Sequence, residues 1–411
     1  MKSVLLVGTY NSRNKGDAAM QLTAAQQVLQ HVPGVRITLS SPFPEIDAPF
    51  YHPLPVVRSN RRRLIWATMQ LMRAGLWTAA QRRLERDLPA LLAEPEVCAT
   101  RDADLVLDLS GDMMTEDYGP HVAYSHFLPV LLAHALRRPY ALCAQSIGPF
   151  QWTRPVARRI LADAAWITVR DEITLDYVRG LGIRAPRVEF TADLAFLLEP
   201  ASSERIDELL AAERVSFDEG PVLGVSVSQL IESHYAKHNP HAAAQPLAEL
   251  IARVLDEVVA RSGCQVLFVS HVTGPSRVKD DRIISRAVRA QMTEPAHVLE
   301  GDYDPRELKG VIRRCHAFVG ARMHANIAAL SSEVPVVALS YSHKTPGIMR
   351  LLGQEDLVCP IAELDRADLL EKVADVLGHR EERAHTLAER LPAVRARASR
   401  NIELVVETLG C

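Results

Sequence analysis

The chain has 411 residues, of which 48% are apolar and 24% charged, and its formal net charge is −3 at pH 7. That length predicts two domains of roughly 150–200 residues each, and the composition is typical of a folded protein and excludes a disordered one. The small net charge, without a long acidic or basic tail, gives no support for a nucleic-acid partner.

The cysteines and the N-terminus both indicate a protein of the cytoplasm. Six cysteines occur without any CxxC spacing, which argues against a zinc site and against a disulfide framework. The sequence begins MKSVLLVGTY, and its apolar run is too short for a signal peptide or a membrane span. We therefore expect a reduced, cytoplasmic protein without a metal or a cofactor.

Short apolar segments alternate with longer amphipathic ones in the first half of the chain. The apolar segments are SVLLVGTY, ADLVLDLSG, YALCAQSIG and AWITVRD, and helices are expected after them near 17–31, 121–137, 154–164 and 172–181. Strands without polar alternation are buried on both faces, which is typical of a parallel sheet with helices on each side.

The same pattern restarts at residue 221. Strands are expected at PVLGVSVSQ, CQVLFVSHV, AHVLEG, AFVGAR and VPVVALSY, and helices near 243–261, 278–291, 305–314 and 322–331. The acidic stretch between the two series, 197–221, is expected to be a loop. The sequence thus predicts an α/β protein with two doubly wound, Rossmann-like domains facing each other across a cleft, over 1–200 and 215–390. A C-terminal helix is expected over 391–411, and one alternative has it returning to the N-terminal domain.

Polar residues stand where several of these strands end, and in doubly wound sheets ligands bind at that edge. Asp17 would cap the helix after the first strand, or that helix start would bind an anion. Arg170 would form either an ion pair with Asp171 or a ligand contact, and the charged group at 279–282 fits a solvated helix start. The candidate binding residues at these ends are Asn14, Gly16, Asp17, Gly111, Gln145, Ser146, Arg170 and His271.

Residues 320–353, GARMHANIAALSSEVPVVALSYSHKTPGIMRLLG, combine polar groups with a spacing that predicts burial. The pattern predicts a strand, a glycine turn and a helix with Arg322 and His324 in its first turn. Lys344 follows the next strand, and neighbouring parallel strands end side by side. A lone histidine here would be a core residue bound to a carbonyl. An arginine, a histidine and a lysine at a helix start instead indicate a site for a small, highly charged anion, with the histidine able to move a proton.

These motifs resemble those of the polysaccharide pyruvyl transferases, particularly the colanic-acid type. The resemblance implies a GT-B-like fold with the acceptor side in the N-terminal domain and the donor side in the C-terminal one. It implies transfer of the enolpyruvyl group of phosphoenolpyruvate to two sugar hydroxyls as a cyclic ketal, with His324, Arg322, Lys344 and additionally Arg170 in the active site. The similar segments are NKGDAAM, QSIGPF, VRDEITLDYVRGLGI, TADLAFLL, HVTGPSRVKDDR, and a Gly-x-Arg-x-His, Pro, Tyr-x-x-Lys signature at 320–344 that includes Tyr341.

The chemistry of phosphoenolpyruvate fits the residue types of this signature. Its carboxylate and phosphate need cations, which Arg322 and Lys344 supply, and its C3 must be protonated, for which His324 is the candidate acid. Two alternatives stay open. A nucleotide-sugar glycosyltransferase would share the fold, although its usual glutamate pattern is not found near 320–345. A non-catalytic member would explain why Ser228 stands where relatives commonly carry an arginine.

The stretch RSNRRRLIWATMQLMRAGLWTAAQRRLER, residues 58–86, contains eight arginines and one glutamate. One interpretation is an ordinary helix whose apolar face packs on the first domain while its arginines stay solvated. The other is a basic amphipathic surface that rests on the anionic inner face of a membrane and brings the protein to a lipid-linked acceptor. The sequence leaves both open.

Overall fold

The computed structural model describes residues 1–411 except 86–87, 184–186, 219, 241, 244 and 342–343. The chain folds into two compact units. Unit 1 comprises Met1–Ser12, Met20–Leu194 and Ala396–Cys411, and unit 2 comprises Arg13–Ala19 and Ala195–Arg395. A short segment near the N-terminus therefore belongs to the same unit as the second half of the chain.

Unit 1 is built on a seven-stranded sheet in the order β3-β2-β1-β4-β5-β6-β7, in which every neighbouring pair is parallel. The central strands are buried along their whole length, as their unbroken apolar sequences predict. The strands are β1 (Ser3–Val7), β2 (Arg36–Ser41), β3 (Val56–Arg58), β4 (Leu105–Asp108), β5 (Tyr140–Gln145), β6 (Trp166–Val169) and β7 (Arg187–Phe190).

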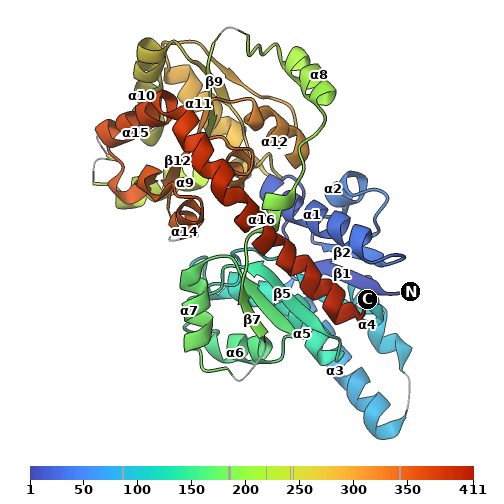
Figure 1. Ribbon diagram of the computed structural model, residues 1–411. Helices are drawn as coiled ribbons and strands as arrows, with labels where there is room; N and C mark the ends of the chain where they lie inside the picture. Colours follow the sequence, from blue (N-terminus) through green and yellow to red (C-terminus); the bar gives the residue numbers. More distant parts are fainter. Residues whose placement is uncertain (86–87, 184–186, 219, 241, 244, 342–343) are drawn as a thin grey trace. The chain divides into compact units, whose positions relative to one another are not determined.

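The helices of the first half of the chain complete the core of unit 1 (Figure 1). Phe127 and Ile160, from two of these helices, pack with Leu5 and Leu142 of the sheet. The helices are α1 (Lys15–His31), α2 (Pro44–Phe50), α3 (Leu64–Leu84), η1 (Pro89–Leu92), α4 (Pro95–Asp102), α5 (Pro120–Ala135), α6 (Arg154–Ala162) and α7 (Glu172–Gly180).

Unit 2 repeats this plan with a six-stranded parallel sheet in the order β10-β9-β8-β11-β12-β13. Its three central strands are again buried throughout. The strands are β8 (Val222–Ser226), β9 (Gln265–Phe268), β10 (Ala296–Val298), β11 (Ala317–Gly320), β12 (Val336–Ser340) and β13 (Val358–Pro360).

Several helices of the second half begin at a residue whose side chain caps them, among them α8, α9, α11, α12 and α15. Asp304 accepts hydrogen bonds from the Arg306 and Glu307 amides, and Glu307 accepts one from the Asp304 amide, which is a capping box. The helices are η2 (Leu194–Leu197), α8 (Ser203–Glu213), α9 (Gln229–His238), α10 (Leu247–Ser262), η3 (Arg277–Lys279), α11 (Asp281–Gln291), α12 (Pro305–Arg313), α13 (Met323–Leu330), α14 (Lys344–Leu351), η4 (Glu355–Leu357), η5 (Ile361–Glu363), α15 (Arg366–Gly378) and α16 (Arg380–Leu409).

The predicted α/β class with two doubly wound, parallel sheets is confirmed, and each strand expected from an apolar run is present. The loop expected over 197–221 is wrong, because that stretch contains α8. Ser202 caps this helix by accepting from the Arg205 amide at 3.3 Å, and Ile206 is buried against Gly310 of α12. The acidic residues dominate the composition of this stretch, so the helical spacing of its apolar residues was overlooked.

Candidate active site

The carboxyl edge of the unit 2 sheet brings several predicted residues together. His271 follows β9, Arg322 is the N-cap of α13 after β11, and Lys344 begins α14 after β12. Strands β11 and β12 are direct neighbours, with Gly320 level with Ala338. Lys344 is buried, as is Ser228, which caps α9 after β8. The sequence-based expectation that Arg322 and Lys344 follow neighbouring strands therefore agrees with the observed topology.

The segment around Asn14 lies against this edge within unit 2. Asn14 forms an antiparallel bridge with Val272, and the Lys15 amide donates to the His271 carbonyl at 2.9 Å. A side chain at Gly16 would collide with the imidazole of His324. The glycine therefore lets His324 lie directly on the backbone. We call Asn14, Lys15, Gly16, His271, Arg322 and His324 the His324 cluster.

The start of α1 differs from the expectation in one detail. The helix begins at Lys15, so Asp17 lies within its first turn rather than at the cap. The cap position is occupied by Asn14, whose side-chain oxygen accepts from the Gly16 amide at 3.2 Å. Asp17 nevertheless remains an acidic residue in a first turn, where it is favoured by the helix dipole.

Arg322 is oriented by a carboxylate that the sequence analysis treated as solvated. Its Nε and Nη2 donate to the two carboxylate oxygens of Asp281, at 2.9 and 2.8 Å. Asp281 is fully buried, and burial raises its pKa while Arg322 opposes the rise. The interpretation of 279–282 as a solvated helix start is therefore wrong. A fork-to-fork pair of this kind fixes both the position and the plane of a guanidinium group.

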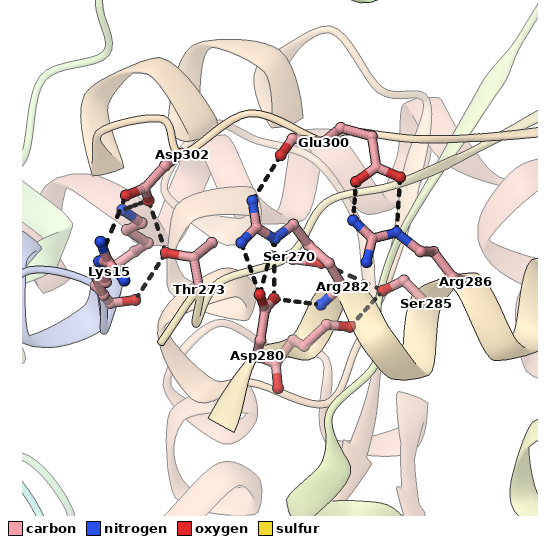
Figure 2. Close-up of polar contacts among 11 residues, drawn as sticks. Lys15, Ser270, Thr273, Asp280, Arg282, Ser285, Arg286, Glu300 and Asp302 are labelled. Carbon is pink, nitrogen blue, oxygen red and sulfur yellow. Dashed lines mark hydrogen bonds and ion pairs between the residues drawn. The ribbon is translucent and has the colours of Figure 1, made fainter. Parts of the chain in front are cut away.

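The neighbouring acidic and basic residues are also paired (Figure 2). Arg282 donates to Asp280 at 2.7 Å and to the Glu300 carbonyl at 2.6 Å, and Arg286 forms an ion pair with the Glu300 carboxylate. These contacts hold the N-terminal part of α11, which carries Asp281, to the segment that follows β10.

His271 is buried in the middle of the His324 cluster. Its pKa is lowered to about 3 by burial and further by the neighbouring charges of His324, Lys15 and Arg322. At neutral pH the His271 imidazole is therefore uncharged. His324, the proton donor expected from the sequence, is one of its neighbours in the cluster.

Lys15 is a site residue that sequence reasoning missed. Its ammonium group is buried and donates to Asp302 at 2.5 Å, while the Thr273 hydroxyl donates to the same carboxylate at 2.7 Å (Figure 2). Burial lowers the pKa of Lys15, and Asp302 opposes that effect. The sequence did contain an indication of this role. A lysine in the first turn of a helix is disfavoured by the helix dipole, which suggests that another interaction stabilises it.

Tyr341 lies one residue after β12 and is half-buried. Its ring stands beside that of His234 on α9, with the centroids 5.1 Å apart. Residues 342–343, between Tyr341 and Lys344, lie outside the described residues.

The remaining predicted residues form a separate group in unit 1. Arg170 is buried and forms an ion pair with Asp193 at 2.5 Å, so its partner is not Asp171. Its Nε donates to the Ser146 hydroxyl at 3.0 Å, and that hydroxyl donates to Asp171 at 2.7 Å. Asp171 in turn caps α7 through the Thr174 amide. The guanidinium is thus held at the carboxyl edge of the unit 1 sheet.

Gln145 and Gly111 belong to the same group. The Gln145 amide donates to the Asp108 carboxylate at 2.8 Å, and burial raises the pKa of Asp108 to about 6. Gly111 has a φ of +65°, and a side chain there would contact Met20 and approach the Arg170 guanidinium. Within the described part of the chain, Asp108 Oδ2, Gln145 Oε1 and Arg170 Nη2 have no hydrogen-bond partner. Three buried polar atoms at neighbouring strand ends are consistent with water or a ligand at this edge.

Comparisons with known proteins agree with this architecture and with the motifs. The chain is similar to the amylovoran biosynthesis protein AmsJ of Erwinia amylovora, at 25% identity over 312 residues, which cover 75% of this chain and 73% of that protein. Its fold is similar to that of UDP-GlcNAc 2-epimerase from Neisseria meningitidis bound to UDP-GlcNAc, with a TM-score of 0.62 and 11% identity over 99% of this chain and 100% of the other. It is also similar to Alr3699/HepE of Anabaena in complex with UDP and glucose, with a TM-score of 0.59 and 14% identity over 100% and 99% of the two chains. These likenesses show a GT-B-type fold.

A family model gives the more specific result. The model for polysaccharide pyruvyl transferase matches residues 14–343, a range that begins at Asn14 and contains Gly16, His271, Arg322 and His324. Both the segment before α1 and the start of α13 thus lie within the matched region. The chain belongs to the polysaccharide pyruvyl transferase family.

Proposed function

We propose that this chain transfers the enolpyruvyl group of phosphoenolpyruvate to two hydroxyls of a sugar in a cell-surface polysaccharide precursor, forming a pyruvate ketal and releasing phosphate. Family membership supports a transferase of polysaccharide biosynthesis. The observation that carries the finer proposal is the His324 cluster, in which the His324 imidazole lies against the backbone of Gly16 and shares a pocket with the buried Lys15, while Arg322 is fixed by Asp281.

His324 would supply the proton that the reaction needs first. Protonation of C3 of phosphoenolpyruvate turns the methylene into a methyl group and leaves C2 electrophilic. One sugar hydroxyl then adds to C2 and loses its proton, which the deprotonated imidazole is placed to accept. Cleavage of the C2–O bond releases phosphate, and the second hydroxyl closes the ketal with loss of its proton. Atoms and charge balance without an oxidant or a reductant.

Arg322 and Lys344 would bind the anionic groups of the donor. The ion pair with Asp281 uses two of the five N–H groups of Arg322 and presents the guanidinium in a fixed plane, which suits a carboxylate. Lys344 is buried at the start of α14, where a charge on the departing phosphate would be stabilised. No additional cofactor is needed for these steps.

His324→Ala tests the assignment directly. We expect phosphate release from phosphoenolpyruvate, measured with an acceptor mixture, to fall about 10²–10⁴-fold, because a positioned acid is removed. His297→Ala is the matched control, since His297 is an exposed histidine of the same unit, and it should keep the wild-type rate. A folded His324→Ala protein with near-normal phosphate release would contradict the role of His324.

The same assay tests the two alternatives, a nucleotide-sugar donor and a protein without catalytic activity. A nucleotide-sugar-dependent glycosyltransferase would consume a UDP-sugar and leave phosphoenolpyruvate intact, and a non-catalytic member would consume neither. Parallel incubations with each donor and the same acceptors therefore separate the three possibilities. We expect consumption of phosphoenolpyruvate alone.

We also propose that α3 gives the protein a peripheral contact with an anionic membrane, near a lipid-linked acceptor. Among the described residues, no helix is long and apolar enough to cross a bilayer. Helix α3 contains no acidic residue, and four of its apolar side chains, spaced as one helical face, are largely exposed: Ile65 (83%), Met69 (46%), Met72 (65%) and Leu76 (62%). Such a basic, apolar face fits the headgroup region of an anionic leaflet.

A further inference from the structure

A pocket in unit 2 lies beside the candidate acid and contains two lysines that the sequence signature does not include. It is bordered by the first turn of α1, the segment around η2, the loop after β9, and helices α12 and α13. No carboxylate is among the residues that line it. Those residues are Lys15, Ala19, Ala195, Leu198, His271, Pro305, Lys309, His324 and Ala328.

Lys309 is a buried cation that pairs with no carboxylate of the described chain. Only 3% of its surface is exposed, and its ammonium group donates to the Leu198 carbonyl at 2.6 Å. Among the residues that the structure describes, it forms no ion pair. Burial lowers its pKa to about 8, and Arg395 and Arg313 act in the same direction while Glu199 opposes them. A buried ammonium group costs stability unless a negative charge offsets it.

Lys15 and His271 also favour a negatively charged ligand in this pocket. Lys15 is paired with Asp302, so the two lysines of the pocket are balanced by one direct carboxylate partner. His271 is 96% buried, and its Nδ1 has no hydrogen-bond partner in the described part of the chain. In the described part of the chain, the pocket thus has one ammonium group without a direct carboxylate partner and one ring nitrogen without a hydrogen-bond partner.

We infer that this pocket binds a phosphate-type oxyanion between Lys309 and Lys15. Lysines bind phosphate as point charges, whereas a carboxylate is better matched by a planar guanidinium. The two ammonium groups come from different helices, α1 and α12, that border the pocket. Nδ1 of the neutral His271 can accept the proton of a hydrogen phosphate oxygen. The inference rests on the proposed function and deepens it by adding Lys309 and Lys15 to Lys344 as residues for the donor's phosphate, but phosphate binding itself does not require ketal formation.

Calorimetric titration of the full-length protein with inorganic phosphate, at constant ionic strength set with chloride, tests the inference. We expect Lys309→Met to weaken phosphate binding about tenfold or more, because one charge-assisted contact is lost. Lys372→Met is the matched control, since Lys372 of α15 binds Asp368 and the Val358 carbonyl away from the pocket. It should leave phosphate binding unchanged.

Two further measurements separate a binding role from a structural one. Asp302→Asn removes the carboxylate that competes for Lys15, so we expect tighter phosphate binding. We expect Lys309→Met to keep or raise the midpoint of thermal unfolding without phosphate, since an unpaired buried charge is removed. No phosphate binding by the wild type, equal binding by Lys309→Met, or a lower midpoint with an unchanged phosphate response would overturn the inference.

Competition between inorganic phosphate and phosphoenolpyruvate distinguishes a site for the donor's ester phosphate from a site for the released phosphate. If phosphoenolpyruvate displaces inorganic phosphate and loses affinity in Lys309→Met, the pocket holds the ester phosphate of the donor. If both bind together, it holds the released phosphate. Phosphate binding that depends on Lys309, together with no transfer from phosphoenolpyruvate to any acceptor, would contradict the proposed function and leave the pocket assigned.

Discussion

At the level of single residues, the orientation of His324 depends on the absence of a side chain at position 16. We predict that Gly16→Ala displaces the imidazole and lowers the rate of phosphate release from phosphoenolpyruvate by at least about 10²-fold, as expected for a misplaced acid. The phosphate-release assay measures this rate.

Gly180→Ala is the control for this substitution, because no atom would contact the added methyl group there. It should retain the wild-type rate. If Gly16→Ala and Gly180→Ala were equally active, the close contact between Gly16 and His324 would have no bearing on catalysis.

Asp108 gives a pH-dependent prediction in unit 1. Its pKa in the folded protein is about 6, above the ordinary value of 3.8, so the stability that its protonated form provides is complete below about pH 4 and is lost as the pH rises through 6. Asp108→Asn keeps the oxygen that accepts from Gln145 and Ser110 but does not titrate. We expect its free energy of unfolding, relative to the wild type, to rise by about 3 kcal/mol between pH 4 and pH 7.

Urea unfolding followed by tryptophan fluorescence measures this change for the relevant unit, because all four tryptophans lie in unit 1. A difference between Asp108→Asn and the wild type that stayed constant from pH 4 to pH 7 would show that Asp108 does not titrate in this range.

Sequence reasoning identified the residues of the site that belong to a motif and missed those whose role depends on burial. Arg322 and His324 were predicted at the start of a helix from the spacing of apolar residues around them, and the structure places them there. Asp281 was interpreted as part of a solvated helix start, and Lys15 was not singled out. The packing of segments that are distant in sequence shows that both are buried and paired.

At the level of elements, apolar runs predicted most of the buried strands and the edge strand β10, but they missed β2 and the edge strands β3, β7 and β13. Strands β3 and β13 have three residues each, and β7 is only partly buried. Such edge strands lack the unbroken apolar run that burial on both faces produces, so their sequences resemble loops. Helix α8 was missed for a related reason, because its exposed acidic face dominated its composition.

Helix α3 packs on unit 1 with one face and leaves apolar side chains exposed on the other. One face packs against α5, where Ala74 and Trp77 are buried with Leu132 and Leu136, and the opposite face carries the exposed apolar stripe. Arg61, one of the arginines before it, is buried and donates to the Gly8 carbonyl at 2.7 Å. Arg61 therefore serves the fold of unit 1 and is unsuitable for testing membrane binding.

We predict that the wild type sediments with vesicles containing an anionic lipid at low salt and not with neutral ones. Arg63→Glu combined with Arg73→Glu should weaken this binding by at least about 30-fold, since each arginine near such a surface contributes about 1 kcal/mol and each glutamate adds repulsion. Ile65→Ser combined with Met72→Ser should weaken it as well.

The matched control for the charge change is Arg154→Glu combined with Arg158→Glu, two exposed arginines of α6 in the same unit, and it should bind like the wild type. Absence of wild-type binding to anionic vesicles, or an equal loss in the α6 control, would rule out a membrane contact specific to α3.

At the level of the whole molecule, two Rossmann-like units on one chain define a fold that many transferases and epimerases share, so the fold alone does not identify the donor. UDP-GlcNAc 2-epimerase has a similar fold at 11% identity. The donor assignment rests instead on the His324 cluster and on the family to which the chain belongs. A measurement that follows the carbon atoms of the donor is therefore the most direct test.

The decisive experiment incubates the full-length protein in D₂O with phosphoenolpyruvate labelled with carbon-13 at C2 and with glycan intermediates extracted from cells that lack the gene. We predict a glycan product in which the labelled carbon is a ketal carbon, the adjacent methyl group carries one deuterium, and phosphate is released in equal amount. Consumption of a UDP-sugar from the same mixture, with the labelled phosphoenolpyruvate left intact, would contradict the account.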